Sequence, residues 1–218
     1  TSSALPALIN GDIAVSGGQL TPGLINSISG GANVRIVANK GTILPGSCIS
    51  DAILVRRDLV ESGAVKSVAD LKGKTIAGGD EQTYGINRAL ALGNLTTDDV
   101  ELVSLPRAAI PVGFENKAFD AAYLMEPYIT EVVRNGKAVI FLPGEAFTPN
   151  LTNPIYYGTA FTRTNPELGR RFMVAYLQGV EQYNEGKTDR NLDILSNYTP
   201  MNRDALKETC WVPILENG

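Results

Sequence analysis

The chain alternates between short apolar runs and amphipathic segments over most of its length. Each apolar run is three to five residues long and is bounded by Gly, Pro or polar residues, which is typical of buried strands. We expect strands at residues 13–16, 34–38, 53–55, 75–77, 101–105, 121–124, 139–142 and 157–161. The amphipathic segments predict helices at residues 22–29, 67–71, 83–92, 114–119 and 128–134. This alternation predicts an α/β fold in which strand–helix–strand units form parallel strand pairs.

The last part of the sequence changes to helical patterning alone. Asn165 is a suitable N-cap, and Pro166 then occupies the first position of a helix. Apolar side chains recur along this helix at spacings of four or three, namely Leu168, Phe172, Tyr176, Val180 and Tyr183. This stripe predicts a face that packs on the core. Met201 and Leu206 flank Asn202 as a hydrophobic staple and predict a final short helix.

The chain contains the same strand–turn–helix pattern twice. Both copies have a Gly-Gly pair, a short linker and a threonine at the helix start: Gly17, Gly18 and Thr21 in the first, Gly78, Gly79 and Thr83 in the second. Glycine lets the backbone approach a ligand closely, and a helix N-terminus offers unpaired N–H groups with a partial positive charge. The two turns could face each other across a ligand. Alternatively, they are the ordinary strand-to-helix turns of α/β proteins.

The composition narrows the chemistry that the chain can perform. Its 218 residues carry 19 Lys and Arg against 23 Asp and Glu, a net charge of −4 that disfavours a nucleic-acid partner. The absence of histidine excludes Ser-His and Cys-His catalytic pairs and imidazole metal sites. Cys48 and Cys210 are too few for a structural zinc site or a disulfide scaffold. They form either one long-range disulfide in an oxidising compartment or two buried thiols.

Common nucleotide-binding and hydrolase motifs are missing. Gly73-Lys74 lacks the glycine that a phosphate-binding loop needs five residues earlier, because Val68 is there. The patterns GxGxxG and GxSxG do not occur. No apolar run approaches the roughly 18 residues of a membrane span. We therefore expect no cofactor and no metal, and Glu126 is the one convincing acid–base candidate.

Four segments resemble, in the same order, motifs of one protein family. They are Asn10–Ala14 (NGDIA), Val68–Ala77 (VADLKGKTIA), Asp99–Val103 (DVELV) and Phe119–Pro127 (FDAAYLMEP). On these residues the chain resembles the nitrate/sulfonate/taurine and thiamine-precursor solute-binding proteins of ABC importers. The resemblance extends over nearly the whole chain. One departure is that Ala118 and its neighbours replace the glycine that usually stands before the Asp-Ala pair.

The resemblance implies a type 2 periplasmic-binding fold, with two α/β lobes of mixed, mostly parallel sheets and a hinge cleft between them. Lobe one would comprise residues 1–53 and 162–218, and lobe two residues 54–161. Relatives carry about 30 further residues, one strand–helix–strand unit, before Thr1. They also continue beyond Gly218. We therefore expect this sequence to be a fragment trimmed at both ends.

Ligand capture by such a fold needs polar groups from both lobes. From lobe one we expect Gly17, Gly18, Thr21 and Ser47, and from lobe two Thr83, Tyr84 and Glu126, with Tyr157 or Tyr156 stacking on an aromatic ligand. A carboxylate at Glu126 would suit an amino group or a protonated ring nitrogen. Alternatively, Glu126 stabilises the N-terminus of the following helix.

The function that the resemblance implies is capture of a small polar organic ligand by hinge closure, as the solute-binding component of an ABC importer. The ligand would be sulfonate, taurine-like or pyrimidine-like, and the protein partner would be the importer's permease. Such a protein works in the periplasm or at the extracellular face of the cytoplasmic membrane, which it meets only through the permease or a lipid anchor. The alternatives are an enzyme on the same fold, acting on a pyrimidine- or chorismate-derived compound, and the sensor domain of a regulator.

Overall fold

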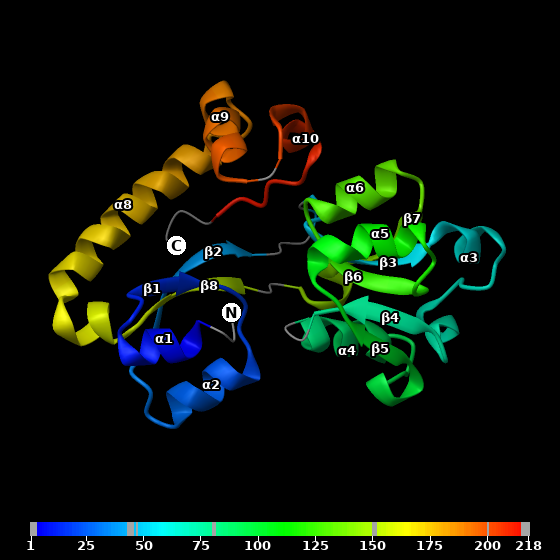
Figure 1. The fold of residues 1–218 in the computed structure, drawn as a ribbon, viewed down its shortest axis with the longest axis horizontal. Coiled ribbons are helices and arrows are strands. Elements are labelled where there is room, and N and C mark those ends of the chain that lie inside the picture. Colours follow the sequence, from blue (N-terminus) through cyan, green and yellow to red (C-terminus); the bar gives the residue numbers. More distant parts are fainter. Residues whose placement is uncertain are drawn as a thin grey trace. The chain divides into compact units, whose positions relative to one another are not determined.

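The computed structural model describes residues 4–42, 46, 48–79, 82–149, 152–199 and 201–214 (Figure 1). The chain forms two compact units. Unit 1 consists of Thr1–Thr42, Leu151–Lys207 and Val212–Gly218, and unit 2 of Ile43–Asn150 and Glu208–Trp211. The main part of unit 2 thus begins at residue 43 rather than 54 and ends at 150 rather than 161. The short return to unit 2 near the end of the chain was not expected from the sequence.

Unit 1 contains a three-stranded sheet in the order β1-β8-β2, together with helices. Its elements are α1 (Leu5–Asn10), β1 (Val15–Gly17), α2 (Pro22–Ser29), β2 (Arg35–Thr42), β8 (Thr152–Tyr157), the π-helical turn η5 (Ala160–Thr164), α8 (Pro166–Asn184), α9 (Asp189–Tyr198) and α10 (Arg203–Glu208). β1 and β2 each pair antiparallel with β8 instead of pairing with each other. The expected parallel pair is therefore wrong, because a strand from much later in the chain is inserted between them.

The end of β8 also differs from the expected strand at 157–161. β8 stops at Tyr157, and Gly158 lies so close to α1 that an added Cβ would be 2.4 Å from the Leu8 carbonyl oxygen. The Gly158 N–H donates to the Ala14 carbonyl at 2.9 Å, and the chain then enters η5. A close backbone contact far away in the sequence, rather than the local apolar pattern, ends this strand.

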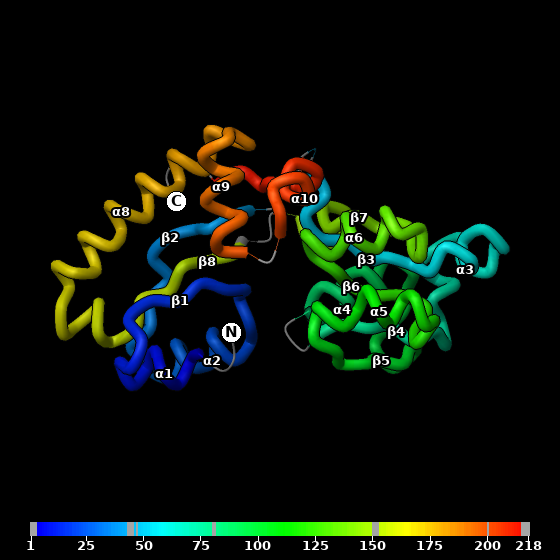
Figure 2. Tube along the Cα trace, turned by 45° about the horizontal axis from the view of Figure 1, so that its top comes forward, coloured from blue at the N-terminus to red at the C-terminus, as the bar shows by residue number. Residues whose placement is uncertain are grey.

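Two apolar clusters stabilise unit 1, one on each side of β8. Tyr156 packs with Leu8, Leu24 and Val34, while Ile155 and Tyr157 belong to a second cluster with Phe161, Phe172, Met173 and Tyr176. The long helix α8, yellow in Figure 2, contributes Phe172 and Tyr176 of its expected stripe to the second cluster, and Val180 of the same stripe is also buried. Leu168 in its first turn is the exception, since it is 44% exposed.

Unit 2 contains a five-stranded mixed sheet in the order β5-β4-β6-β3-β7. Its strands are β3 (Asp51–Arg56), β4 (Thr75–Gly78), β5 (Glu101–Ser104), β6 (Ala121–Met125) and β7 (Ala138–Pro143). Its helices are α3 (Arg57–Glu61), α4 (Thr83–Ala91), α5 (Ile110–Glu115), α6 (Tyr128–Arg134) and α7 (Gly144–Phe147), with 3-10 turns η1 (Val68–Leu71), η3 (Thr97–Asp99) and η4 (Arg107–Ala109). β4 pairs in parallel with β5 and β6, whereas β3 is antiparallel to β6 and β7. The α/β fold with mixed sheets is therefore confirmed.

One helix of unit 2 is shifted from its expected place. α5 runs from Ile110 to Glu115, whereas the sequence pattern predicted residues 114–119. The helix begins early because Pro111 suits its first turn, where the missing N–H has no helical partner. It cannot extend to residue 119, because Lys117 adopts a left-handed φ of 54°.

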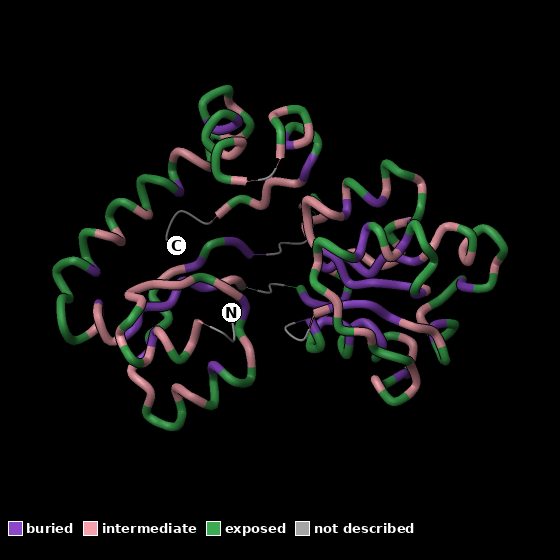
Figure 3. The backbone as a smooth tube through the Cα atoms, viewed as in Figure 1, coloured by how far each residue is buried: buried purple, intermediate pink, exposed green. Residues whose placement is uncertain are grey.

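The sheet of unit 2 is covered on both faces, and buried residues follow its strands (Figure 3). Along β3, Ile53 and Val55 face one apolar cluster, while Ala52 and Leu54 face the other. A strand that is buried on both faces reads as a continuous apolar run, which is why this segment was easy to predict.

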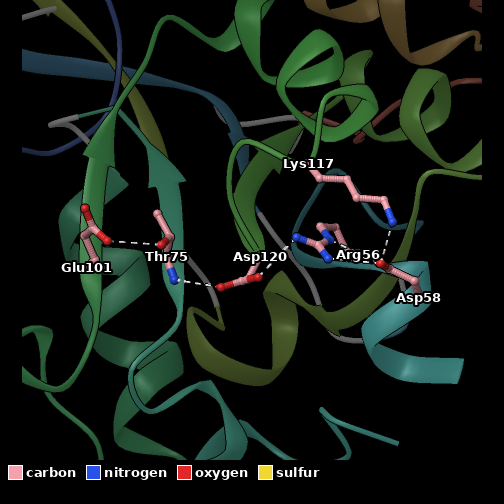
Figure 4. A network of polar contacts seen from close by, with 6 residues as sticks. All are labelled: Arg56, Asp58, Thr75, Glu101, Lys117 and Asp120. Carbon is pink, nitrogen blue, oxygen red and sulfur yellow. Dashed lines mark hydrogen bonds and ion pairs between the residues drawn. The ribbon is translucent and has the colours of Figure 1, made fainter. Parts of the chain in front are cut away.

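β4, β5 and β6 are parallel, so their carboxyl ends lie at one edge of the sheet. A polar network occupies the opposite edge (Figure 4). Asp120 accepts hydrogen bonds from the Thr75 N–H at 3.1 Å and from Arg56 Nη1 at 3.3 Å. Arg56 and Lys117 also bind Asp58, and their hydrogen bonds hold the pKa of that carboxyl well below its usual range. The aspartate of the family-like FDAA segment therefore ties strands together.

Cys48 and Cys210 form a disulfide, with their Cα atoms 5.5 Å apart. Of the two alternatives that the sequence left open, the pair of buried thiols is therefore wrong. Cys48 is exposed and Cys210 is half-buried. Both residues belong to unit 2, although 162 positions separate them in the sequence.

Candidate ligand-binding site

The start of α4 presents hydrogen-bond donors just beyond the carboxyl end of β4. Its N-cap is Gln82, one residue before the predicted start at Thr83. Gln82 Oε1 accepts a hydrogen bond from the Gly79 N–H at 2.6 Å, which closes the turn and fixes the orientation of the amide. The residue is only 1% exposed, and its Nε2 has no hydrogen-bond partner among the residues that the structure describes. An unpaired buried donor is costly, so this position suits an acceptor oxygen of a ligand.

The glycines around this turn have packing roles. A Cβ on Gly78 would lie 2.9 Å from Ile86 Cδ1, and one on Gly85 would lie 2.6 Å from Tyr123 Cε1. The N–H of Gly79 is already used by Gln82. In this turn the Gly-Gly pair therefore shapes the strand-to-helix connection, and the Gln82 amide offers a donor.

Asp51 and Tyr123 form a buried, hydrogen-bonded pair, and the Tyr123 ring lies against the first turn of α4. The Tyr123 hydroxyl donates to Asp51 Oδ2 at 2.7 Å, and the Ser50 hydroxyl donates to Asp51 Oδ1 at 3.3 Å. Burial raises the pKa of Asp51, although these two hydrogen bonds oppose the rise. Burial and the nearby Asp51 charge raise the pKa of Tyr123. The pair holds the Tyr123 ring in the place that Gly85 leaves open.

Arg107 is a residue that the sequence analysis missed. β5 pairs with β4 in parallel, and the Leu105 N–H continues this pairing by donating to the Gly78 carbonyl at 3.1 Å. Arg107 follows two residues later, and its positive charge acts to lower the pKa of Tyr123, against the larger effect of burial. A cation therefore lies at the same sheet edge as the start of α4. The signal was available: Arg107 is the first charged residue after the predicted strand at 101–105.

Glu126 follows β6 at this edge, but its carboxylate has protein partners. It accepts hydrogen bonds from the Thr130 N–H at 3.1 Å, the Thr130 hydroxyl at 2.8 Å and the Cys210 N–H at 3.4 Å. These contacts match the alternative interpretation, in which Glu126 stabilises the first turn of α6. The remaining capacity of the carboxylate for a ligand amine is small.

The other residues expected for this half of the site are exposed or lie outside the described residues. Thr83 and Tyr84 lie in the first turn of α4, both exposed, and Tyr84 is 57% exposed. Ser47 lies outside the described residues. Within unit 2, the structure therefore brings Gln82, Thr83 and Tyr84 to the end of β4, and Glu126 to the end of the neighbouring strand β6.

In unit 1 the expected residues cluster at the end of β1, and part of their hydrogen-bonding capacity is used. Gly18 donates its N–H to the Pro154 carbonyl at 3.2 Å. Thr21 caps α2, its Oγ1 accepting from the Leu24 N–H at 3.3 Å. A Cβ on Gly17 would lie 3.0 Å from Lys40 Cδ, so the Lys40 chain passes close to this glycine. The Thr21 hydroxyl hydrogen can still be donated.

Tyr156 and Tyr157 are both in the core of unit 1, and this position argues against their expected stacking role. Tyr156 is 1% exposed and donates its hydroxyl to the Gln19 carbonyl at 2.6 Å. Tyr157 is 7% exposed and donates to the Gly169 carbonyl at 2.6 Å. Burial raises the pKa of Tyr156 to about 12. Both rings are structural in this arrangement, because β8 places them on the two apolar clusters.

The described part of the chain contains no group of three or more Cys, Asp or Glu side chains placed to hold a metal ion. None of the helices in these ranges has the length and hydropathy needed to cross a membrane.

Comparison with known proteins gives one family and several similar folds. A family model described as NMT1/THI5 like matches residues 54–185, more than half of the chain. No curated protein matches the sequence.

Solved structures share the fold at low sequence identity. The alkanesulfonate-binding protein SsuA from Xanthomonas axonopodis pv. citri, bound to MOPS, has a TM-score of 0.73 at 21% identity, covering 94% of this chain and 68% of that one. The periplasmic nitrate-binding protein NrtA from Synechocystis PCC 6803 has a TM-score of 0.69 at 15% identity, covering 93% and 57%. The desulfurization enzyme DSZB has a TM-score of 0.66 at 15% identity, covering 94% and 71%. The chain therefore spans 57 to 71% of these proteins.

Proposed function

Since this chain belongs to the NMT1/THI5-like family, we propose that it is the solute-binding component of an ABC importer and captures a small polar organic ligand. The observation that carries the proposal is the buried amide of Gln82 at the start of α4, whose Nε2 has no partner in the described part of the chain. In a folded protein such a donor costs about 1–3 kcal/mol unless it meets an acceptor. A ligand oxygen that reaches this amide would regain that cost on binding.

The charges around Gln82 favour a ligand with a negatively charged or strongly polar oxygen group. The N-terminus of α4 carries a partial positive charge, and Arg107 adds a cation at the same sheet edge. Glu126 would oppose an anion, but its carboxylate is held by Thr130 and Cys210. Among the expected ligand classes, a sulfonate or a taurine-like compound therefore fits unit 2 better than a cationic pyrimidine.

Unit 1 would supply the second set of polar groups, from Gly17, Gly18 and Thr21. The resemblance to solute-binding proteins supports capture by closure of the two units on the ligand. In that scheme the Thr21 hydroxyl donates its hydrogen to the ligand while its oxygen continues to cap α2.

The disulfide supports a site of action outside the cytoplasm. Cytoplasmic thiols are normally kept reduced, whereas disulfides persist in the periplasm and at the cell surface. The Cys48–Cys210 bond therefore fits the periplasm or the extracellular face of the cytoplasmic membrane. The proposed protein partner there is the permease of the importer.

Binding by a matched pair of variants tests the proposal. Gln82→Met removes the buried amide, and Gln178→Met removes an exposed amide on α8 as a control. Titration calorimetry with MOPS, taurine and 4-amino-5-hydroxymethyl-2-methylpyrimidine should show binding of at least one compound. We expect Gln82→Met to weaken that binding about tenfold, equivalent to about 1.4 kcal/mol, and Gln178→Met to leave it unchanged.

Two outcomes would contradict the proposal. One is equal affinity of Gln82→Met and the parent chain for the bound compound. The other is the absence of binding by all three compounds together with no co-purified small molecule in native mass spectrometry. Recovery of the compound chemically unchanged separates simple binding from an enzyme on the same fold.

A further inference from the structure

Lys40 is a charged residue of unit 1 that the proposed function does not use. It lies in β2 and is exposed. β1 and β2 both pair antiparallel with β8, so they run in the same direction and their carboxyl ends lie at one edge of the sheet. Lys40 is close to the end of β2, and Gly17 is the last residue of β1. The lysine therefore belongs to the same sheet edge as the residues expected to bind a ligand in unit 1.

The side chain of Lys40 lies across one face of this sheet. Gly17 and Ala38 both pair with Ile155, one on each side of β8. Lys40 follows Ala38 by two positions, so its side chain points to the same face as that residue. From there it extends over β8 to Gly17, where a Cβ would lie 3.0 Å from Lys40 Cδ and 3.2 Å from Lys40 Cε. The ammonium is bonded to Cε and therefore lies close to the end of β1.

Glycine at position 17 leaves room for this path. An added Cβ would also lie 3.1 Å from Ile155 Cδ1, so it would meet Ile155 as well as the Lys40 stem. These distances are shorter than favourable carbon–carbon contacts, and a larger residue would displace the lysine. In unit 2 the Gly-Gly pair makes room for packing within the turn. In unit 1 its first glycine makes room for a cation.

A lysine on an edge strand has a simpler explanation, and the path of Lys40 argues against it. β2 is at the edge of its sheet, and lysines on edge strands hinder pairing with another chain. Such a lysine acts by placing its charge at the open edge. Lys40 extends the other way, across β8 toward β1, and so takes its charge away from that edge. Its stem covers the sheet while its charged end stays at the surface beside β1.

The chemistry of the ammonium defines what it would bind. An ammonium has three N–H donors and no acceptor, so it can bind a ligand oxygen as well as a protein group. An ionised acid is the strongest acceptor for such a donor, whereas an ammonium of a ligand would be repelled. The Thr21 hydroxyl, which follows β1 in the chain, can donate to the same acidic group.

We propose that Lys40 is a ligand-binding residue of unit 1 and takes an acidic group of the ligand. The inference rests on the proposed function, in which Gln82 and Arg107 of unit 2 bind a sulfonate-like group. A ligand with one acidic group for each unit carries two acids. The inference therefore selects sulfonates that also have a carboxylate over taurine-like compounds, whose second group is an ammonium.

Three sulfonates with three carbons each test this selection by titration calorimetry at pH 7. Propane-1-sulfonate has a neutral end, 3-sulfopropanoate a carboxylate and 3-aminopropane-1-sulfonate an ammonium. We expect the carboxylate to strengthen binding to the parent chain about tenfold relative to the neutral end, and the ammonium to weaken it. Equal affinities of the three compounds, or tighter binding of the ammonium compound, would overturn the inference.

Lys40→Met keeps an apolar stem and removes the charge, and Lys137→Met is the matched control. Lys137 is exposed and precedes β7, whose first residue, Ala138, pairs with Arg56 at the edge of the unit 2 sheet opposite the candidate site. We expect Lys40→Met to weaken binding of 3-sulfopropanoate about tenfold and to abolish its advantage over propane-1-sulfonate, while Lys137→Met retains both. An equal loss in Lys137→Met would reduce the effect to net charge and overturn the inference, as would full affinity of Lys40→Met.

Gly17→Ala tests the path of the lysine. It should weaken binding of 3-sulfopropanoate about threefold in the parent chain, because the methyl group displaces Lys40, and should have no effect in the Lys40→Met chain. Equal losses in both chains would contradict this path. Binding of none of the three sulfonates would also overturn the inference, whereas the proposed function would still be decided separately by MOPS, taurine and the pyrimidine.

Discussion

Asp51 has a buried carboxylate, and burial disfavours its charged form. The residue is 1% exposed, and the hydroxyls of Tyr123 and Ser50 donate hydrogen bonds to it. Burial is the largest influence and raises the pKa of Asp51 above 3.8, its value in an unfolded chain. The folded state therefore binds this proton more tightly than the unfolded state does. The stability that Asp51 contributes is fully present below pH 3.8 and is lost as the pH rises through its folded pKa.

Replacement of Asp51 by asparagine should remove this pH-dependent loss. The amide oxygen can still accept from the Tyr123 hydroxyl, while no charge is left to bury. We expect the urea midpoint of Asp51→Asn to rise relative to that of the parent chain as the pH increases from about 4 to about 8. Parallel midpoint curves for the two proteins would show that the ionisation of Asp51 is not penalised by folding.

Asp58 provides a control of opposite sign. Its hydrogen bonds with Arg56 and Lys117 lower the pKa of Asp58, so its contribution is present above pH 3.8 and is lost as the pH falls through the lowered value. The urea midpoint of Asp58→Asn should therefore fall relative to that of the parent chain over the same rise in pH. A general effect of replacing an aspartate cannot produce opposite trends at the two positions.

At the scale of elements, the position of α4 depends on how closely it packs on β6. The ring of Tyr123 occupies the space beside Gly85, and a Cβ there would lie 2.6 Å from Tyr123 Cε1. The ring cannot retreat easily, because Tyr123 is 1% exposed and its hydroxyl is fixed by Asp51. Substitution of this glycine should push the first turn of α4, and with it Gln82, away from the sheet.

Gly85→Ala and Gly179→Ala form a matched pair, since both place alanine in a helix. We expect Gly85→Ala to lower the free energy of unfolding by about 1–3 kcal/mol through overpacking. Gly179 in α8 has nothing within 4 Å of an added Cβ, so Gly179→Ala should raise stability by about 0.5–1 kcal/mol. Chemical denaturation measures both. A gain for Gly85→Ala would mean that the helix adapts without cost.

The elements that the sequence predicted well are those whose pattern is local. The segment at 53–55 was found because β3 is buried on both faces and reads as an unbroken apolar run. The errors arise from contacts between distant residues. Insertion of β8 between β1 and β2, and the end of β8 at Gly158 against Leu8, depend on chain more than a hundred positions away. A single sequence contains no direct record of such contacts.

At the scale of the whole molecule, the sequence and the structure point to the same part of unit 2 for the candidate site, but to different side chains. The glycine pattern identified the start of α4, yet the side chain with an unsatisfied donor is Gln82, one position before the predicted Thr83. Tyr157 was expected to meet a ligand because aromatic rings often do, but alternation along β8 places it in the core. Composition allowed the disulfide without requiring it. Burial and pairing of individual polar groups are properties of the folded chain.

The disulfide should act on the stability of the protein through the unfolded chain. It links residues 162 positions apart, so it removes a large amount of conformational freedom from the denatured state. We expect reduction to lower the free energy of unfolding by about 2–4 kcal/mol in urea titrations followed by circular dichroism. The dependence on urea should become steeper, because the reduced unfolded chain is more expanded. The Cys48→Ala, Cys210→Ala chain should give one curve with and without reductant. Equal midpoints for the oxidised and reduced parent chain would mean that this crosslink constrains the native state alone.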